Sequence, residues 1–426
     1  MRVCVIGTGY VGLTTGTVLA EFGHEVYCID RDEAKINLLN RGTIPIYEPG
    51  LTEMVMRNKK QKKLYFTTNT IEAVNKCPII LIAVGTPPCT DGSPNLTYLE
   101  NVIDEISKYI SSHKTIIIKS TVPPGTNEWV DEALHKKGLK RNLYDIVSNP
   151  EFLREGSAVS DMLHPDKIVV GVKRPEVIKT MQLLYQNINA PFIFTTLNGA
   201  EMIKYASNAF LATKISFMNE IARICDAYNV DIKDVALGLS TDPRIGSLFL
   251  NSGLGFGGSC FPKDLQALEH AAKQKNIIPE ILIAVQNVNT TQINLYIDKL
   301  LQEFPSLKNK KITVWGLSFK PNTDDTRYSK ALSLIEHLKT SGADIHAYDP
   351  IVTLNSSPPI CHKDIYESIE NTDALIIATE WDQFSKVDWK KVSELMRGNI
   401  VIDGRNFIEP YLLKRNNLKY IGVARP

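Results

Sequence analysis

Residues 1–30 read MRVCVIGTGYVGLTTGTVLAEFGHEVYCID, and this segment indicates how the first domain folds. An apolar run at 2–6 ends at three glycines, Gly7, Gly9 and Gly12, and an apolar helical pattern follows them. A second β-type run, HEVYCID, then ends at Asp30. This order of strand, tight turn, helix and strand is a βαβ unit, whose right-handed crossover predicts a parallel sheet.

The three glycines have the G-x-G-x-x-G spacing between a strand and a helix, which indicates a dinucleotide site. Gly7 allows the tight turn, Gly9 lets a pyrophosphate approach the backbone, and Gly12 allows close packing of the helix. Free N–H groups at the helix N-terminus face the phosphates. Asp30 is placed to accept hydrogen bonds from the adenosine ribose and would repel a 2′-phosphate, which favours NAD over NADP, although Arg31 weakens that preference. A flavin site or an empty glycine-rich turn are the alternatives.

Short, continuous Val/Ile runs recur at 78–84, 115–120 and 145–150, as is typical of buried parallel strands. We therefore expect residues 1–195 to form a doubly wound, Rossmann-like α/β domain that binds NAD.

The pattern then changes to helical spacing across 196–305, where a long helix is expected to join two domains. Strand and helix patterns alternate again over 306–426 without the glycine fingerprint. The fold class is thus α/β, with two Rossmann-like doubly wound domains joined by a long central helix and a helical domain, and the second sheet is expected to take a different ligand.

Composition excludes several classes of protein. The formal net charge is +1, and the one basic run, RNKKQKK at 57–63, is expected to be a solvated face, so nucleic-acid binding is not predicted. Seven cysteines without a CxxC pair predict neither a disulfide framework nor a metal site. No apolar stretch reaches the roughly 18 residues of a membrane span, and we expect a cytoplasmic protein.

One cysteine stands apart, because Cys260 lies between a glycine-rich run and a helical pattern in GLGFGGSCFPKDLQALEHAAK, residues 253–273. The helix N-terminus and Lys263 would favour its anionic form. Lys204 and Asn208 are four residues apart, hence on one face of the long apolar helix, and buried polar groups need partners. A small packing cysteine, an exposed lysine and a neutral asparagine are the alternatives.

Several motifs together carry a resemblance. They are GTGYVG (7–12), PIYEPGL (45–51), KSTVPPGT (119–126), SNPEFLREG (148–156), KYASNAF (204–210), DPRIG (242–246), GFGGSCFPKD (255–264), GLSFKPNTDDTR (316–327) and DGRN (403–406). In this order they resemble the UDP-glucose/GDP-mannose dehydrogenase family over essentially the whole chain. The pairing of DPRIG with GFGGSCFPKD is similar to the glucose-acting branch. The N-acetylhexosamine branch has a histidine where this chain has Ser259.

The resemblance implies oxidation of the C6 alcohol of UDP-glucose to a carboxylate, with two NAD⁺ and one water. It gives Cys260 the role of a nucleophile that converts the aldehyde into a thiohemiacetal and then a thioester. The same chemistry on GDP-mannose or a UDP-N-acetylhexosamine remains an alternative. So do a two-electron β-hydroxyacid-type dehydrogenase, which leaves Cys260 unexplained, and a nucleotide-sensing protein without turnover.

The resemblance also assigns the site. Lys204 and Asn208 stabilise the oxyanion, Asp264 positions water and Lys204, and Glu151 is the general base. The catalytic set is Cys260, Lys204, Asn208, Asp264, Glu151 and Thr121, and the cofactor set is Gly7, Gly9, Tyr10, Val11, Gly12, Asp30, Lys35, Thr86, Thr121, Glu155, Lys263 and Arg327.

The substrate set begins on the NPEFLREG motif and continues through the glycine-rich run into the last domain. Its members are Glu151, Phe152, Leu153, Arg154, Glu155, Lys204, Asn208, Arg244, Phe249, Leu250, Asn251, Ser252, Gly253, Gly257, Phe261, Lys320 and Arg405. By the same resemblance the chain forms a homodimer in which Arg244 reaches the partner's substrate. A surface arginine is the alternative for Arg154 and Arg244.

Overall fold

The computed structural model describes residues 1–354 and 359–426. Its contacts divide the chain into two compact units. The first unit comprises Met1–Ser207 with Gln266–Asn276, and the second comprises Asn208–Leu265 with Ile277–Pro426. The helices α9 (Leu197–Ala227) and α11 (Phe261–Gln274) each contain residues of both units.

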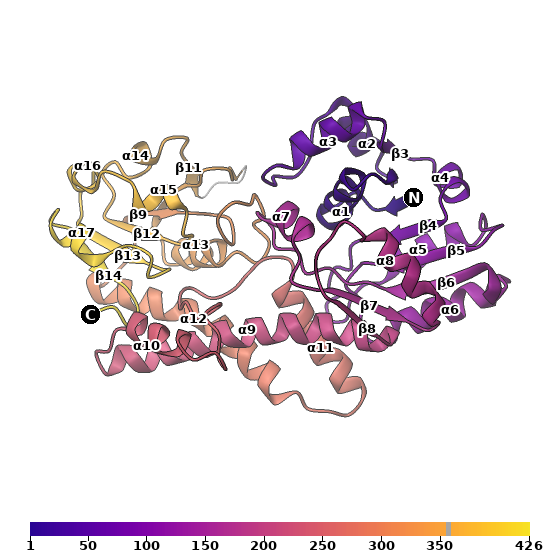
Figure 1. Ribbon diagram of the computed structural model, residues 1–426. Helices are drawn as coiled ribbons and strands as arrows, with labels where there is room; N and C mark the ends of the chain where they lie inside the picture. The colour runs from indigo at the N-terminus through magenta and orange to yellow at the C-terminus, as the bar shows by residue number, and fades with distance from the viewer. Residues whose placement is uncertain (355–358) are drawn as a thin grey trace. The chain divides into compact units, whose positions relative to one another are not determined.

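The first unit is built on an eight-stranded sheet in the order β3-β2-β1-β4-β5-β6-β7-β8 (Figure 1). Every neighbouring pair is parallel except β6 and β7, which are antiparallel at Val147 and Val172. The strands are β1 (Arg2–Ile6), β2 (Glu25–Ile29), β3 (Leu64–Thr67), β4 (Ile79–Ile82), β5 (Lys114–Ile118), β6 (Tyr144–Ser148), β7 (Ile168–Val172) and β8 (Phe192–Thr195).

Helices cover both faces of this sheet because its side chains alternate between two apolar cores. Val3 and Val5 of β1 belong to one core, with the helices α1, α2, α3, α7 and α8, whereas Cys4 and Ile6 belong to the other, with α4, α5 and α6. The helices are α1 (Tyr10–Glu21), α2 (Glu33–Arg41), α3 (Leu51–Lys60), α4 (Thr70–Lys76), α5 (Thr97–Ile106), α6 (Thr126–Lys136), α7 (Ala158–Leu163) and α8 (Ile178–Leu184).

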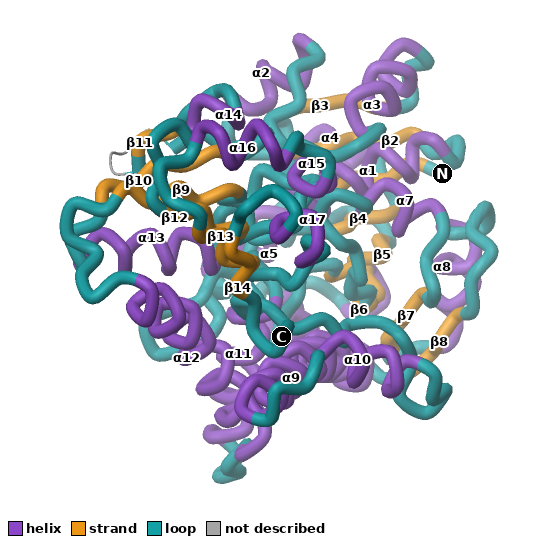
Figure 2. The backbone as a smooth tube through the Cα atoms, turned by 90° about the vertical axis from the view of Figure 1, so that its left-hand side faces the viewer, coloured by secondary structure: helices purple, strands orange, loops and turns teal. Residues whose placement is uncertain are grey.

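The second unit carries a six-stranded, all-parallel sheet in the order β11-β10-β9-β12-β13-β14 (Figure 2). Its strands are β9 (Lys311–Trp315), β10 (Asp344–Tyr348), β11 (Ile360–Cys361), β12 (Ala374–Ile377), β13 (Ile400–Asp403) and β14 (Lys419–Ile421). Its remaining helices are α10 (Ile232–Ser240), α12 (Glu280–Glu303), α13 (Lys330–Thr340), α14 (Ile365–Ser368), α15 (Asp382–Ser385), α16 (Trp389–Leu395) and α17 (Pro410–Lys414).

One face of this second sheet packs on α12 and α13 through an aliphatic core, and the other packs on α14 to α17 through an aromatic one that includes Trp315, Trp381, Phe384 and Trp389. The predicted α/β class, with two Rossmann-like sheets and a long central helix, is therefore confirmed.

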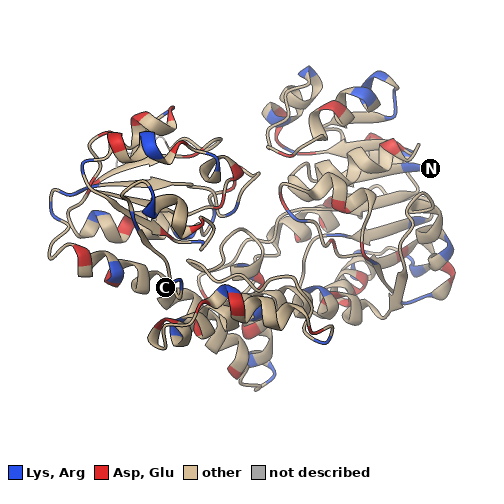
Figure 3. Cartoon of the chain, turned by 60° about the vertical axis from the view of Figure 1, so that its left-hand side comes forward, with Lys and Arg blue, Asp and Glu red and all other residues tan. Residues whose placement is uncertain are grey.

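Acidic and basic residues are interspersed along the helices of each unit (Figure 3). Among the described residues, no helix combines the length and the apolar character that a membrane crossing requires.

Candidate functional site

The glycine turn after β1 has the geometry that a dinucleotide requires. Gly7 adopts φ +99°, and a Cβ on Gly12 would lie 1.9 Å from the Gly7 carbonyl oxygen, so a side chain at either position would disrupt the turn. A Cβ on Gly9 would meet no atom within 4 Å, which leaves space beside the N-terminus of α1. None of the described side chains caps α1 at Gly9, so its N–H groups remain available for phosphate oxygens.

Asp30 is held as an anion at the end of β2. Its Oδ2 accepts hydrogen bonds from the Thr8 amide (3.0 Å), the Thr8 hydroxyl (2.7 Å) and the Lys35 ammonium (3.0 Å). Burial raises the pKa of Asp30, but these hydrogen bonds and one from the Asp32 amide outweigh burial and hold the pKa below its usual value. The charge suits a ribose diol, and the residues of this turn therefore fit NAD.

Lys35, predicted near the adenosine, thus forms an ion pair with Asp30. The predicted cofactor residues Thr86 and Thr121 also come together, since the Thr86 hydroxyl donates to the Thr121 carbonyl at 2.8 Å.

Tyr10, predicted as a cofactor residue, also contacts segments far from it in the sequence. Its hydroxyl contacts Glu48, and the Gly156 amide donates both to that hydroxyl (2.8 Å) and to Glu48 (2.7 Å). These contacts tie the glycine turn to the end of the NPEFLREG motif.

A buried ion pair joins Glu151, just after β6, to Lys204 of α9 at 3.1 Å. Glu151 is 6% exposed and Lys204 is 3% exposed. The Leu153 amide also donates to Glu151 at 2.5 Å, and the Lys204 ammonium lies 5.2 Å from the centre of the Phe152 ring. Burial raises the pKa of Glu151, but Lys204 and the Leu153 amide have a larger opposite effect. The net pKa lies below its usual value, so the carboxylate stays ionised.

Lys119 is a third charged member of this buried group, and it was missed in the sequence. It is 4% exposed and donates to the Asn149 side-chain oxygen at 3.4 Å. Burial lowers the pKa of Lys119 to about 8, an effect that Glu151 opposes and Lys204 reinforces. The signal was present, because KSTVPPGT puts a lysine directly after the continuous Val/Ile run of β5.

In the second unit, Cys260 directly precedes the first residue of α11, and its carbonyl accepts the first helical hydrogen bond from the Asp264 amide at 2.9 Å. The Ser259 hydroxyl lies 3.7 Å from the Cys260 sulfur. Asp264, which is 2% exposed, accepts from the Asn208 amide group (2.6 Å) and the Lys263 ammonium (2.5 Å). Three polar residues of the predicted site are therefore joined by direct contacts, Lys263 and Asp264 on the first turn of α11 and Asn208 on α9.

Helix α9 carries Lys204 and Asn208 one turn apart, as their spacing predicts. Each has a carboxylate partner, Glu151 for Lys204 and Asp264 for Asn208. Lys263, predicted as a cofactor residue, pairs with Asp264.

The glycine-rich run is packed more tightly than expected. A Cβ on Gly257 would lie 2.3 Å from the Tyr328 carbonyl oxygen, so this glycine is required by protein packing. The Gly253 amide donates to the Asn219 side chain at 2.8 Å, and the Ser252 hydroxyl accepts from Asn406 at 3.1 Å. Phe249 has φ +64°, and its ring lies 6.3 Å from that of Phe261.

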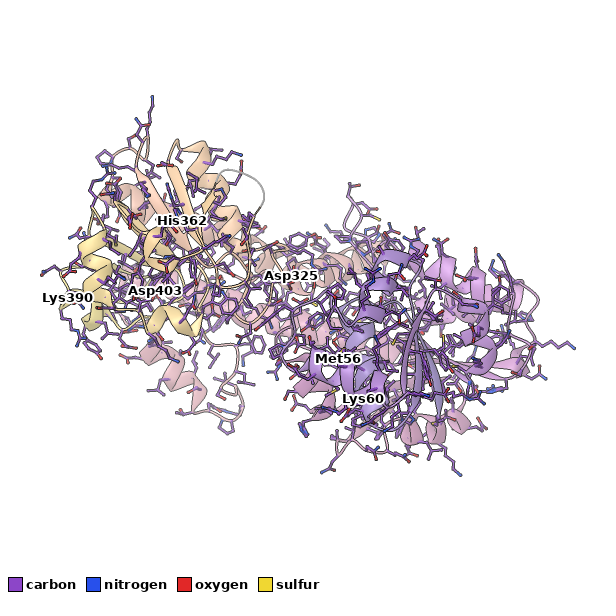
Figure 4. All side chains as sticks on the ribbon, turned by 90° about the horizontal axis from the view of Figure 1, so that it is seen from above. Met56, Lys60, Asp325, His362, Lys390 and Asp403 are labelled. Carbon is purple, nitrogen blue, oxygen red and sulfur yellow. The ribbon has the colours of Figure 1, made fainter. Side chains whose placement is uncertain are left out.

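Arg405 binds three loops of the second unit to one another. Its guanidinium donates to the carbonyl oxygens of Ala378 (2.8 Å), Gly255 (3.2 Å) and Phe319 (3.3 Å). Asp403 orders the same turn, since this fully buried carboxylate accepts from the amides of Arg405, Phe407 and Ile408. Figure 4 shows Asp403 inside the second unit and Lys390 at its surface.

Three predicted arginines pair with an aspartate of their own segment. Arg154 contacts Asp161, Arg244 contacts Asp242, and Arg327 contacts Asp325, each in a bidentate arrangement. The Lys320 ammonium lies 5.5 Å from the centre of the Phe319 ring.

Sequence models of one family match three successive parts of the chain. The UDP-glucose/GDP-mannose dehydrogenase family matches by its NAD binding domain at 1–189, its central domain at 198–291 and its UDP binding domain at 313–410.

Curated relatives align with the whole chain. YtcA of Bacillus subtilis, provisionally named a UDP-glucose 6-dehydrogenase, is 50% identical and both chains are covered completely. The UDP-glucose 6-dehydrogenase TuaD of the same organism is 43% identical over 100% of this chain and 93% of its own.

Two solved structures are also similar over nearly the full length. A UDP-glucose dehydrogenase from Pyrobaculum islandicum superposes with a TM-score of 0.92 at 35% identity, covering 99% of this chain and 97% of its own. A UDP-D-ManNAc dehydrogenase from Pyrococcus horikoshii superposes with a TM-score of 0.90 at 28% identity, covering 100% and 99%.

Proposed function

Because the chain belongs to the UDP-glucose/GDP-mannose dehydrogenase family, we propose that it oxidises the C6 alcohol of UDP-glucose to the carboxylate of UDP-glucuronate with two NAD⁺. Curated relatives at 43% and 41% identity are named UDP-glucose 6-dehydrogenase, which supports this substrate. The observation that carries the chemistry is Cys260 at the start of α11, beside the Asn208–Asp264–Lys263 contacts.

In the proposed mechanism, bound NAD⁺ accepts a hydride in each of the two oxidations. The first removes a hydride from C6 and a proton from its hydroxyl, leaving an aldehyde. The Cys260 thiolate then adds to the aldehyde carbon, and the thiohemiacetal so formed again carries a hydrogen on C6 that can leave as hydride. Its oxidation gives a thioester, and water releases the carboxylate and restores the thiol.

The polar residues of α9 stabilise negative charge in these steps. The Lys204 ammonium and the Asn208 amide group donate to the C6 oxygen as charge develops on it. Glu151 activates the water that hydrolyses the thioester. Because Lys204 holds Glu151 as an anion, we infer that this carboxylate becomes an effective base only when Lys204 turns toward the C6 oxygen. Asp264 keeps Asn208 oriented by accepting its N–H.

A substrate panel tests the reaction. Purified protein is incubated with NAD⁺ and each of UDP-glucose, GDP-mannose, UDP-N-acetylglucosamine and UDP-N-acetylmannosamine, and NADH and the acid product are quantified. We expect two NADH for each UDP-glucuronate formed. A higher kcat/KM on another sugar would reassign the substrate, and one NADH per sugar would exclude the four-electron oxidation.

We also propose a homodimer that uses α9. Phe210, Phe217 and Ile224 are spaced by seven residues, hence on one side of the helix, and are 65%, 52% and 50% exposed in the single chain. An apolar stripe of this kind is typical of an interaction surface. The Arg244 side chain is 87% exposed, which suits a residue that reaches a partner.

Sedimentation velocity tests the dimer. The wild-type chain is expected to sediment as a dimer, and Phe217→Glu is expected to sediment as a monomer, because the interface would have to bury an unpaired charge. Exposed Leu183→Glu, away from α9, serves as the control. A wild-type monomer with full activity would refute the dimer and the role of Arg244 in it.

A further inference from the structure

Glu201 is a buried carboxylate on α9 that the mechanism above does not use. It is 2% exposed and accepts three hydrogen bonds from residues far away in the sequence. The Gly125 amide donates at 2.7 Å, the Asn127 amide at 2.8 Å and the Asn127 side chain at 2.6 Å. All of these groups belong to the first unit.

These bonds attach α9 to the loop between β5 and α6, which contains Thr121. The loop ends at Gly125, which has φ +98°, and none of the described side chains of α6 caps its first turn from within the helix. Glu201 therefore provides the N-terminal cap of α6 from another element. Helices are commonly capped by a serine or aspartate of their own segment, but Gly125 has no side chain and its φ of +98° suits glycine. A carboxylate from α9 supplies the cap and also fixes that helix to the loop.

Glu201 precedes Lys204 by three residues, close to one helical turn. The polar contacts that hold this part of α9 in the first unit include that of Glu201 to Gly125 and Asn127 and that of Lys204 to Glu151. If Lys204 turns from Glu151 toward the C6 oxygen during the reaction, the hydrogen bonds of Glu201 still fix the rotation of the helix.

From these contacts we infer that Glu201 is a positioning residue, which holds Lys204 of α9 and Thr121 of the β5–α6 loop in register for hydride transfer. The inference rests on the proposed function for the role of Lys204. Burial raises the pKa of Glu201, and its three hydrogen bonds from N–H donors oppose this effect.

The test compares Glu201→Gln with Asp131→Asn. Asp131 is a matched control, because it is a carboxylate of α6 that is 6% exposed and its side chain is bound by Tyr144, Lys173 and Arg141, which lie outside α9 and the Thr121 loop. Both variants are expected to lower the melting temperature. Glu201→Gln alone is expected to lower kcat about 10- to 100-fold, with KM values changed less than about threefold, since misplacement acts mainly in the transition state.

A double variant tests whether geometry is the cause. In Glu201→Gln the new NH₂ group faces backbone N–H donors, and adding Asn127→Asp supplies an acceptor for it and restores a negative charge at the start of α6. The double variant is expected to recover about three- to tenfold of the lost kcat. If Glu201→Gln does not fold, Asn127→Ala, which removes one donor, is expected to lower kcat about three- to tenfold by the same logic.

Activity is measured on whichever nucleotide sugar the wild-type enzyme oxidises, so a wrong substrate assignment does not affect the result. Hydrogen exchange of the Gly125 and Asn127 amides is measured in parallel and needs no turnover. Faster exchange with reduced kcat in Glu201→Gln supports the inference. A kcat equal to that of Asp131→Asn, or no recovery in the double variant, would overturn it.

Discussion

Replacing Cys260 by alanine is expected to eliminate acid formation, lowering kcat for UDP-glucuronate by about a thousandfold or more. Without the thiolate no thiohemiacetal forms. The hydrogen on the aldehyde carbon then cannot leave as hydride, because that carbon is not tetrahedral. The first oxidation does not need the thiol, so one NADH per active site is expected in a single turnover. Rapid-quench detection of the aldehyde with hydroxylamine measures this directly.

Cys260→Ser and Cys89→Ala complete the comparison. Serine keeps an atom able to add to the aldehyde, but as a much weaker nucleophile, and we expect slow or undetectable acid formation. Cys89 is an exposed cysteine on a different loop and should be replaceable without effect. Two NADH per sugar at the wild-type rate in Cys260→Ala would exclude the thioester route.

Replacing Lys204 by methionine is expected to affect both rate and stability. The rate is expected to fall by at least about a hundredfold, because a donor to the C6 oxygen is lost. The folded state is expected to lose about 3–5 kcal/mol, since Glu151 remains buried without its closest cation. Steady-state kinetics and chemical denaturation measure the two effects.

The loss of stability should depend on pH. In the wild type the pKa of Glu151 lies below its usual value, so its interactions stabilise the fold above the unfolded-state pKa and are lost as the pH falls. Without Lys204, burial raises the pKa of Glu151, and the penalty for its charge disappears as the pH falls and the group is protonated. The difference in unfolding free energy between the two proteins should therefore shrink toward acidic pH.

Lys204→Met with Glu151→Gln separates the two effects. The double variant removes the unpaired charge and should regain most of the stability while remaining inactive. If the double variant does not regain stability, the loss in Lys204→Met comes from packing around the aliphatic part of the lysine side chain.

The strands and the cofactor turn could be predicted because their signals are local. Glycines at fixed spacing and short apolar runs act through the nearest neighbours, and β1, β4, β5 and β6 lie within one or two residues of the expected segments. The same holds for Lys204 and Asn208, whose common face follows from helical periodicity.

Long-range pairing was not predictable in this way. Glu201 meets Asn127 across 74 positions, and nothing near either residue in the sequence indicates the other. Lys119 was missed because a lysine after a strand usually reaches solvent, whereas here the chain around Glu151 encloses it. Arg405 and Gly257 were predicted as substrate residues, and the folded chain adds contacts that the sequence does not indicate. Arg405 donates to three backbone carbonyl groups and pairs with Glu380, and a Cβ on Gly257 would collide with the Tyr328 carbonyl oxygen.

The contacts of Asp30 have a consequence for redesign. Because its Oδ2 accepts from the amide and the hydroxyl of Thr8, the residue that we expect to select the dinucleotide also shapes the glycine turn expected to bind the phosphates. An engineer who replaces Asp30 to admit a phosphorylated ribose would at the same time leave the buried Thr8 amide without its acceptor. Redirecting this enzyme toward NADP therefore calls for a coordinated library at positions 8, 30 and 35, in which each new anion-binding side chain is selected together with a substitute acceptor for the turn.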